Sequence, residues 1–417
     1  MVNNKLIDDF FESLLFVKDK KRMVLFVPFL FFLIWLMGFP LFGPVITQYL
    51  RETTVLKIEK GQILEIFLFS MSITSLMMGY LIDKTSKRKT ILIITTIIIS
   101  IITYLFTIVE TSQMFTLVAL LGFLSGVFLP TWGAYFADSI EIQERGRIMG
   151  LAIGCSMIIS KSFILHIIKV NNSLIIISII SLLTLSIAII KPEETQIRKK
   201  YTKRISLGSN QIAFFVIPVF LFYIVAGILF SVIFPTIQSK MNSSFYYLIW
   251  SIPFLLSSII TSILLDTRGR KTPTIISLAI TGISVGILGI FGTRSGFLPI
   301  ITLAIGFSSF MVYSFILWSD IAPEKSRGTY HGLGFGLIWI AVLLGLIFSG
   351  SEFGVISEEK FRSLLIFSAI IVFLCIPPLI FSIETLPEDI ISRRRIDRHL
   401  KQALKAREEE ERRYLKK

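Results

Sequence analysis

Long apolar stretches alternate with short polar segments along most of this chain. A run of about 18 or more mostly apolar residues predicts a membrane-spanning helix, because hydrocarbon tolerates only a backbone whose hydrogen bonds are satisfied internally. The sequence therefore predicts an all-α integral membrane protein with twelve spans. The predicted spans are about 24–50, 62–82, 90–109, 114–137, 148–168, 173–190, 212–238, 245–265, 274–292, 297–319, 329–350 and 363–383.

Composition supports this prediction. Of the 417 residues, 53% are hydrophobic and only 17% are charged, and the mean hydropathy is +0.77. A soluble protein would carry about 25% charged residues. The two cysteines, Cys155 and Cys375, both fall inside predicted spans, so neither a disulfide framework nor a metal site is predicted. No cofactor is implied.

The distribution of lysine and arginine predicts the orientation. With the N-terminus in the cytoplasm, the inner loops between spans hold 17 basic residues and the outer loops hold 8. Basic loops stay on the cytoplasmic side of a membrane. An even number of spans then places both termini in the cytoplasm, and we expect a multi-pass protein of the cell membrane.

The net charge of +14 is concentrated in the segment 191–211 and in the tail after Glu384. Basic segments beside spans are attracted to the anionic lipids of the inner leaflet, which are the expected partners of this charge. Nucleic acid is not an expected partner, because no aromatic residues interleave with the basic ones.

Two polar patterns occur twice. Asp83 opens the basic loop Asp-Lys-Thr-Ser-Lys-Arg, and Asp266 opens Asp-Thr-Arg-Gly-Arg-Lys, 183 residues later. Asp138 and Asp320 each begin the pattern D-x6-R-G-x3-G, at an offset of 182 residues. Two repeats in the same register indicate a duplicated membrane unit whose halves are related by an axis along the membrane normal.

The repeat predicts five parts. Two six-helix halves are joined by a charged linker, and shorter segments precede and follow them. No cleavage site follows the first span, so we interpret the opening segment as an amphipathic stretch on the membrane surface. The parts are the N-terminal segment 1–22, the first half 23–190, the cytoplasmic linker 191–211, the second half 212–383 and the charged cytoplasmic tail 384–417.

The two loops carry a family resemblance. The segment 79–89, Gly-Tyr-Leu-Ile-Asp-Lys-Thr-Ser-Lys-Arg-Lys, resembles the signature loop between spans 2 and 3 of the major facilitator superfamily, Gly-x-Leu-Ala-Asp-Arg-x-Gly-Arg-Arg/Lys. The segment 265–271 resembles its second copy, between spans 8 and 9. With the twelve spans, the resemblance covers roughly residues 24–390. The departures from the pattern are Ser86, Ser262 and Thr267.

The resemblance implies a secondary transporter that works by alternating access, with aspartate–arginine clusters latching the two halves on the cytoplasmic side. An aspartate that ends a helix at the membrane surface can also meet basic side chains and the positive N-terminus of a neighbouring helix. The alternative is that the basic loops only set the topology. The residues predicted to form the latch are Asp83, Lys87, Arg88, Asp138, Arg145, Asp266, Arg270, Lys271, Asp320 and Arg327.

Candidate substrate-binding residues follow from depth. In this family, spans 1, 4, 7 and 10 line a central cavity, and counting about 1.5 Å per residue places several polar side chains of these spans near the midplane. They could stack on a substrate ring or bind a hydroxyl group, although packing is the commoner role of an aromatic residue in a span. The candidates are Trp35, Tyr223, Ser308, Ser309 and Tyr313.

Lys161 is a further candidate, because it lies slightly beyond the midplane of span 5. A cation there is costly and should face a wet cavity or a partner, where it could attract an anionic substrate group or release its proton. Alternatively, the side chain extends outward to the interface beside His166. Both interpretations stay open at this point.

Several functional alternatives remain. No carboxylate lies in the middle of a span, so coupling to a proton or another cation is open. The arginine and the Gly-Pro pair of the family's drug–proton antiporters are missing, which counts against a drug or amphiphile efflux antiporter. No Gly-x-x-x-x-Gly-Lys-Ser/Thr run supports ATP-driven pumping. We expect a monomeric, non-enzymatic carrier of a small solute, with an organic anion or a metabolite as candidates. The alternatives from other classes are a membrane-embedded enzyme, for which the three histidines are too scattered along the sequence, and a non-transporting sensor or scaffold.

Overall fold

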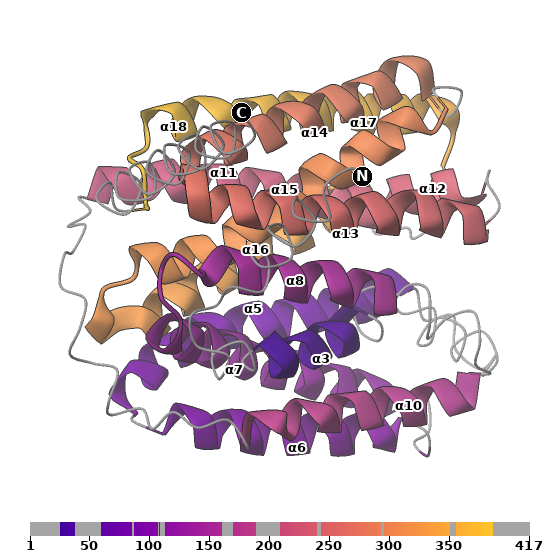
Figure 1. The fold of residues 1–417 in the computed structure, drawn as a ribbon. Coiled ribbons are helices and arrows are strands. Elements are labelled where there is room, and N and C mark those ends of the chain that lie inside the picture. Colours follow the sequence, from indigo (N-terminus) through magenta and orange to yellow (C-terminus); the bar gives the residue numbers. More distant parts are fainter. Residues whose placement is uncertain are drawn as a thin grey trace, which may run out of the picture.

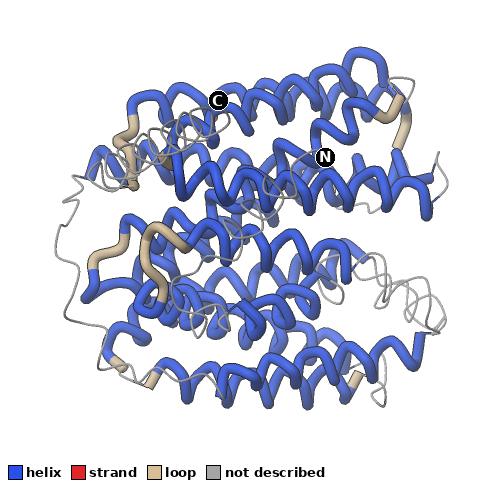
Figure 2. The backbone as a smooth tube through the Cα atoms, viewed as in Figure 1, coloured by secondary structure: helices blue, strands red, loops and turns tan. Residues whose placement is uncertain are grey.

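A computed structural model describes most of the chain. Within the described ranges, every regular element is helical (Figure 2). The described residues are 26–37, 60–85, 87–106, 108, 113–160, 170–188, 209–239, 243–292, 296–350 and 356–386.

The helices form two groups that follow each other along the chain. The first group consists of α3 (Phe26–Leu36), α5 (Lys60–Lys84), α6 (Arg88–Leu105), α7 (Met114–Ser139), α8 (Arg145–Ile158), α10 (Val170–Leu183) and the 3-10 turn η4 (Thr184–Ala188). The second group consists of α11 (Ser209–Ile228), the π-helical turn η6 (Leu229–Ile233), α12 (Phe234–Ser239), α13 (Ser243–Arg268), α14 (Lys271–Phe291), α15 (Leu298–Ile321), the 3-10 turn η8 (Glu324–Ser326), α16 (Arg327–Ser349), α17 (Glu358–Leu374) and α18 (Ile376–Phe381).

Each of the twelve predicted apolar runs contains a helix. Nine of the described helices are long and apolar enough to cross a membrane, and three shorter ones, α3, α8 and α10, occupy predicted spans 1, 5 and 6. The predicted fold class is therefore confirmed. The segment 1–22, most of the linker and most of the tail lie outside the described residues, and α11 begins at Ser209, inside the predicted linker.

The two groups of helices lie side by side (Figure 1). Helices α6 and α10 lie along the outer side of the first half, and α14 and α17 lie along the outer side of the second. Isoleucine side chains of α6 such as Ile94 and Ile101 are half exposed there, whereas α7 and α15 are mostly buried. This is the distribution expected when the outer helices contact lipid and the inner ones contact protein.

The boundary between the halves consists mainly of two helix pairs, α5 with α16 and α8 with α13. Small residues allow the close approach in both. A Cβ atom on Gly332 of α16 would lie only 2.6 Å from the Cα atom of Gly79 in α5. A Cβ atom on Gly150 of α8 would lie 2.5 Å from the carbonyl oxygen of Ser258 in α13. The boundary therefore brings the repeated loop sequences together.

Candidate functional site: charged contacts between the two halves

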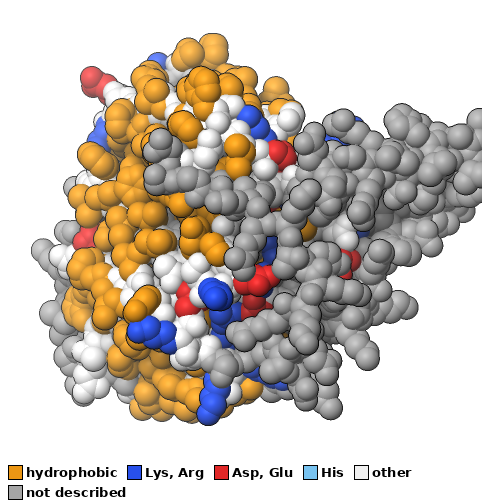
Figure 3. Space-filling view, turned by 90° about the vertical axis from the view of Figure 1, so that its left-hand side faces the viewer, with side chains coloured by type: hydrophobic (Ala, Val, Ile, Leu, Met, Phe, Trp, Pro, Cys, Tyr) orange, Lys and Arg blue, Asp and Glu red, His pale blue; other side chains and the backbone are white. Residues whose placement is uncertain are grey.

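All four repeated aspartates lie at the same end of the helix bundle, which we call the charged end. Helices α5, α7, α13 and α15 end there, and α6, α8, α14 and α16 begin there. Figure 3 looks at this end and shows Lys, Arg, Asp and Glu side chains gathered between two apolar regions. The repeated polar patterns of the sequence thus meet at one place.

Asp83 of the first half binds the first turn of α16 in the second half. Its carboxylate accepts hydrogen bonds from the backbone N–H groups of Gly328 (2.6 Å) and Thr329 (2.7 Å) and from the Thr329 hydroxyl (2.7 Å). The first N–H groups of a helix have no partner within the helix and carry a partial positive charge. A carboxylate from another helix accepts hydrogen bonds from these N–H groups and compensates their partial positive charge.

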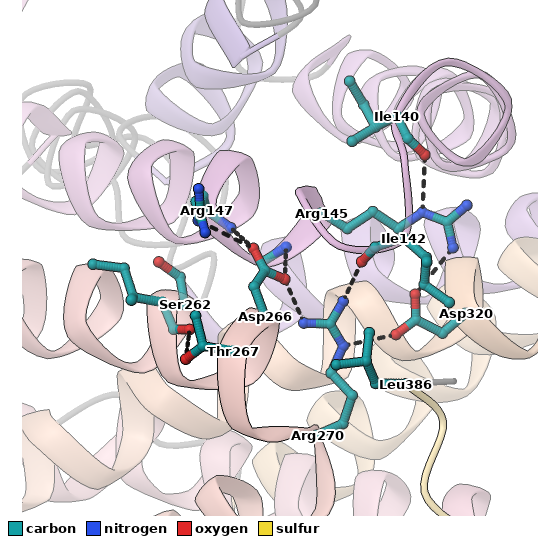
Figure 4. Close-up of polar contacts among 12 residues, drawn as sticks. Ile140, Ile142, Arg145, Arg147, Ser262, Asp266, Thr267, Arg270, Asp320 and Leu386 are labelled. Atoms are coloured by element: carbon teal, nitrogen blue, oxygen red, sulfur yellow. Dashed lines mark hydrogen bonds and ion pairs between the residues drawn. The ribbon is translucent and has the colours of Figure 1, made fainter. Parts of the chain in front are cut away.

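Asp266 makes the reciprocal contact from the second half to the first. Its carboxylate accepts hydrogen bonds from the backbone N–H groups of Gly146 (2.9 Å) and Arg147 (3.0 Å), in the first turn of α8 (Figure 4). A side chain on Gly146 would collide with this carboxylate, since a Cβ atom would lie 2.5 Å from Oδ1. The glycine of the repeated Arg-Gly pair is therefore required by the close approach of the aspartate.

The first charge cluster consists of Asp83, Arg88, Asp138 and Arg327. Arg88 forms an ion pair with Asp138 and lies 3.5 Å from Asp83. Arg327, at the start of α16, reaches across the boundary to the other oxygen of Asp138. One carboxylate at the end of α7 is thus shared by an arginine of each half.

The second charge cluster repeats this arrangement with the halves exchanged and consists of Asp266, Arg270, Asp320 and Arg145 (Figure 4). Arg270 lies 2.6 Å from Asp266 and 2.9 Å from Asp320. Arg145, at the start of α8, crosses the boundary and lies 3.0 Å from Asp320. The two clusters therefore follow the internal repeat of the chain.

The arginines of the second cluster also bind backbone carbonyls across the boundary. Arg145 donates to Ser319 O (2.7 Å), and Arg270 donates to Ile142 O (2.7 Å). Burial alone would lower the pKa of Arg270, but the neighbouring Asp320 and Asp266 raise this pKa above its usual value. Arg270 consequently stays protonated in this contact, because its buried guanidinium is compensated by two carboxylates.

The two clusters differ in their exposure to water. In the second, the Asp266 and Asp320 side chains are fully buried and Arg270 is 1% exposed. In the first, Asp138 is 37% exposed and Arg327 is 17% exposed. Water therefore screens part of the first cluster but not the second, although the sequence repeat makes them look equivalent.

Two basic residues predicted to join the latch lie elsewhere. Lys271 binds the end of α18 in its own half, donating to Ile380 O (2.5 Å) and Ser382 O (2.9 Å). Lys87 precedes α6 with an exposed side chain, and no ion pair joins it to any of the other described residues. Glu384, after the last span, accepts hydrogen bonds from the backbone N–H groups of Arg270 (2.7 Å) and Lys271 (3.1 Å). These residues follow Gly269, which is in the left-handed conformation (φ +106°).

His331 is a boundary residue that sequence reasoning did not select. It lies fully buried in α16, and its imidazole bonds to the Ser319 hydroxyl (2.9 Å) and to Arg327 O (2.7 Å). Its ring fills the space opposite Gly133 of α7, where a Cβ atom would lie 2.7 Å from Cγ of the imidazole. A single histidine at the start of a predicted span carried no signal for this contact, because the residues around it come from three helices.

The predicted substrate-facing residues that the structure describes are buried, and four of them, Trp35, Tyr223, Ser308 and Ser309, are hydrogen-bonded within their own halves. The Trp35 indole donates to Thr103 of α6 (3.0 Å), and the Tyr223 hydroxyl is 2.7 Å from Ser314 of α15. Ser309 lies 2.6 Å from Thr261 of α13. Ser308 is bonded to Ser257 of α13, and the Tyr313 ring lies 5.8 Å from that of Phe310. Lys161 lies outside the described residues.

In each half, an aromatic pair joins the two helices that correspond to the spans expected to line the cavity. The sequence did not predict these pairs. Phe32 of α3 stacks on Phe128 of α7 with ring centroids 3.9 Å apart. Phe222 of α11 contacts Phe310 of α15 at 4.1 Å. Phe128 and Phe310 are separated by the same offset of 182 residues as the charged repeats. One ring of each pair therefore follows the repeat, and that offset was the available signal.

Among the described residues, no three His, Cys, Asp or Glu side chains are grouped as ligands of a metal ion. The fold defines a polytopic helical membrane protein built from two similar halves. The sequence profile of the Major Facilitator Superfamily matches residues 24–333, and the chain belongs to this superfamily. No curated protein sequence matches the chain significantly.

Solved structures share this fold at low sequence identity. The crystal structure of the human organic anion transporter MFSD10 (TETRAN) aligns with a TM-score of 0.66 at 12% identity, covering 87% of this chain and 100% of that one. A bacterial homologue of the iron transporter ferroportin, in its outward-facing state, also aligns with a TM-score of 0.66 at 12% identity, covering 86% of this chain and 97% of the other.

Proposed function

We propose that this protein is a secondary transporter that moves a small solute by alternating access, with the two charge clusters closing the charged end. The observation that supports this is the reciprocal contact of Asp83 with α16 and of Asp266 with α8. A rocking motion of the halves would separate both helix pairs together. Alternating access needs such a contact, strong in one state and absent in the other.

The charged end faces the cytoplasm in this proposal, because the basic loops that lie there carry the excess predicted to stay inside. The small-residue contacts continue from this end as far as Gly336, about 14 Å into α16 at 1.5 Å per residue. In alternating access, a transporter closed over this depth on the cytoplasmic side presents its substrate site to the other side.

The clusters suit a reversible contact. Ion pairs taken out of water gain Coulomb energy but lose hydration, and the two terms largely cancel. When the halves separate, each charged group regains water, so the open and closed states can lie within a few kcal/mol of each other. The first cluster, around Asp138, is the more exposed, so its charged groups lose less hydration on closing than those of the buried second cluster.

The substrate class is proposed from the charge of one predicted intramembrane side chain. Lys161 would supply a cation in span 5, so organic anions are the first substrate class to test, followed by other metabolites. Tyr223, Trp35, Ser308, Ser309 and Tyr313 remain candidate contacts. Coupling to a proton or cation, efflux of amphiphiles and a sensor without flux are distinguished by one experiment. Uptake and counterflow in proteoliposomes, with pH and sodium gradients imposed separately, would show flux only for a transporter.

The closure itself is tested by cysteine labelling. A cysteine replacing Ser75, which is buried where α5 meets α16, reports opening of the charged end when Cys155 and Cys375 are replaced by serine. Asp83→Asn and Asp266→Asn should each increase labelling of this position and change the transport rate at equal amounts of folded protein. The control is Glu358→Gln, at an exposed ion pair with Arg362 at the other end of the bundle. Labelling unchanged from the control would contradict the proposed closure.

A further inference from the structure

A groove runs along the outer side of the second half, between α13 and α14, with α15 as its floor. It has a volume of about 960 Å³. Its rim includes Leu256 and Ile260 of α13 and Ile276 of α14, each at least half exposed. Helix α13 contacts the first half through another face, on which Ser258 and Ser262 lie. The groove therefore faces the surrounding membrane and is separate from the boundary between the halves.

The groove is charged only at one end. Thr267, Arg268 and Thr272 line it at the charged end, and aliphatic side chains such as Leu264 and Ile305 line the remainder. From Arg268 to Pro253 it follows α13 for about 22 Å at 1.5 Å per residue. One leaflet contributes about 15 Å of hydrocarbon. The groove thus has the length and polarity of one lipid, with the polar end at the membrane surface.

Hydroxyl groups along the groove are hydrogen-bonded to other atoms of the protein. Thr261 is bonded to Ser309 of the floor at 2.6 Å, and Ser277 donates to Thr274 O at 2.7 Å. A hydroxyl that is already hydrogen-bonded in the protein presents little unsatisfied polarity to a neighbour. The walls therefore suit a hydrocarbon chain.

Arg268 has a different position from the other arginine of its loop. Arg270 is buried in the second charge cluster, whereas Arg268 is exposed at the end of the groove. In the corresponding loop of the first half, the ammonium group of Lys84 lies over the Tyr80 ring, 4.3 Å from its centroid. An exposed guanidinium at the level of the headgroups matches a phosphate through paired N–H donors.

We propose that this groove binds an anionic phospholipid, with one acyl chain between α13 and α14 and the phosphate at Arg268 beside the Thr272 hydroxyl. Contact between the acyl chain and the groove adds little to the binding affinity, because the surrounding lipid is equally apolar. The charge of the headgroup therefore decides which lipid is retained. The site is independent of the transported solute and requires no opening of the charged end.

Native mass spectrometry of the full-length protein in detergent tests this site, with phosphatidylglycerol and phosphatidylcholine added separately. Phosphatidylglycerol should be retained more strongly, and Arg268→Gln should reduce its retention about fivefold, the factor that corresponds to about 1 kcal/mol per basic residue at an anionic surface. Lys84→Gln is the matched control, because it removes one charge from the equivalent loop of the first half, and it should retain the lipid like the unaltered protein.

Further variants distinguish the contribution of the acyl chain to binding from that of the headgroup. Leu264→Trp leaves the charge unchanged but blocks the place of the acyl chain beneath the headgroup, so the phosphate can no longer reach Arg268 and retention should fall. Arg268→Lys keeps the positive charge and should preserve most of the retention. If Arg268→Gln does not fold, the comparison of Leu264→Trp with the unaltered protein decides. Equal retention of phosphatidylcholine, displacement of phosphatidylglycerol by inorganic phosphate alone, or full retention by the folded variants would each overturn the proposal.

Discussion

Arg145 of α8 and Asp320 of α15 form an ion pair of 3.0 Å across the boundary between the two halves, with both side chains shielded from water. Its counterpart by the internal repeat, between Arg327 and Asp138, is partly open to water. The same residue types at the same register therefore occupy two different electrostatic environments. This difference leads to the first prediction.

Asp320→Asn is expected to destabilise the protein much more than Asp138→Asn. Removing Asp320 leaves two buried guanidinium groups, Arg145 and Arg270, without their shared partner, and losing one partner of a buried ion pair costs about 3–5 kcal/mol. Asp138 is partly hydrated, so its loss should cost about 1 kcal/mol or less. Thermal unfolding of the purified variants measures both effects. Equal losses of stability would show that exposure does not distinguish the clusters.

Gly332→Ala is expected to hold the charged end open. The added methyl group would collide with Gly79 of α5. Either the two helices separate, or the overpacking lowers the stability of the protein by about 1–3 kcal/mol. Labelling of a cysteine at the α5–α16 contact should increase, and transport should fall. Gly286→Ala in α14 is the control, because the nearest atom to its Cβ would be 3.9 Å away. A Gly332→Ala variant that labels like this control would refute the close contact.

His331→Leu is expected to lower the free energy of unfolding by about 1–3 kcal/mol. The substitution keeps an apolar side chain against Gly133 but leaves the buried Arg327 carbonyl and the Ser319 hydroxyl without their imidazole partner. Chemical denaturation in mild detergent measures the change. His399→Leu, in the tail, controls for the loss of a histidine as such, and an equal effect there would remove the assigned structural role.

Tyr223→Phe and Ser314→Ala should have overlapping effects on stability. Each removes the same buried hydrogen bond of 2.7 Å, so each should cost about 1 kcal/mol and the double variant should cost little more. If the Tyr223 hydroxyl also binds substrate in another state, only Tyr223→Phe should raise the KM for transport. Stability costs that add fully in the double variant would show that the two hydroxyls act independently.

The candidate site was predictable to the extent that its residues are repeated. Asp83 and Asp266, or Arg145 and Arg327, stand out because a duplicated pattern marks them at the ends of apolar runs. Lys87 and Lys271 belong to the same loops, yet neither makes a contact between the halves among the described residues. Sequence spacing places a charge at a helix end but does not decide which helix the side chain will face.

The sequence by itself determined the class of protein, the number of spans and the duplication, because the lack of water in hydrocarbon forces long apolar helices and leaves polar residues at their ends. Only the tertiary structure decided the partners. The cap of α16 by Asp83, the placing of His331 against Gly133 and the burial of one cluster rather than the other depend on helices far apart in the chain. Such contacts arise from packing between helices, for which neither apolar periodicity nor local charge carries a signal.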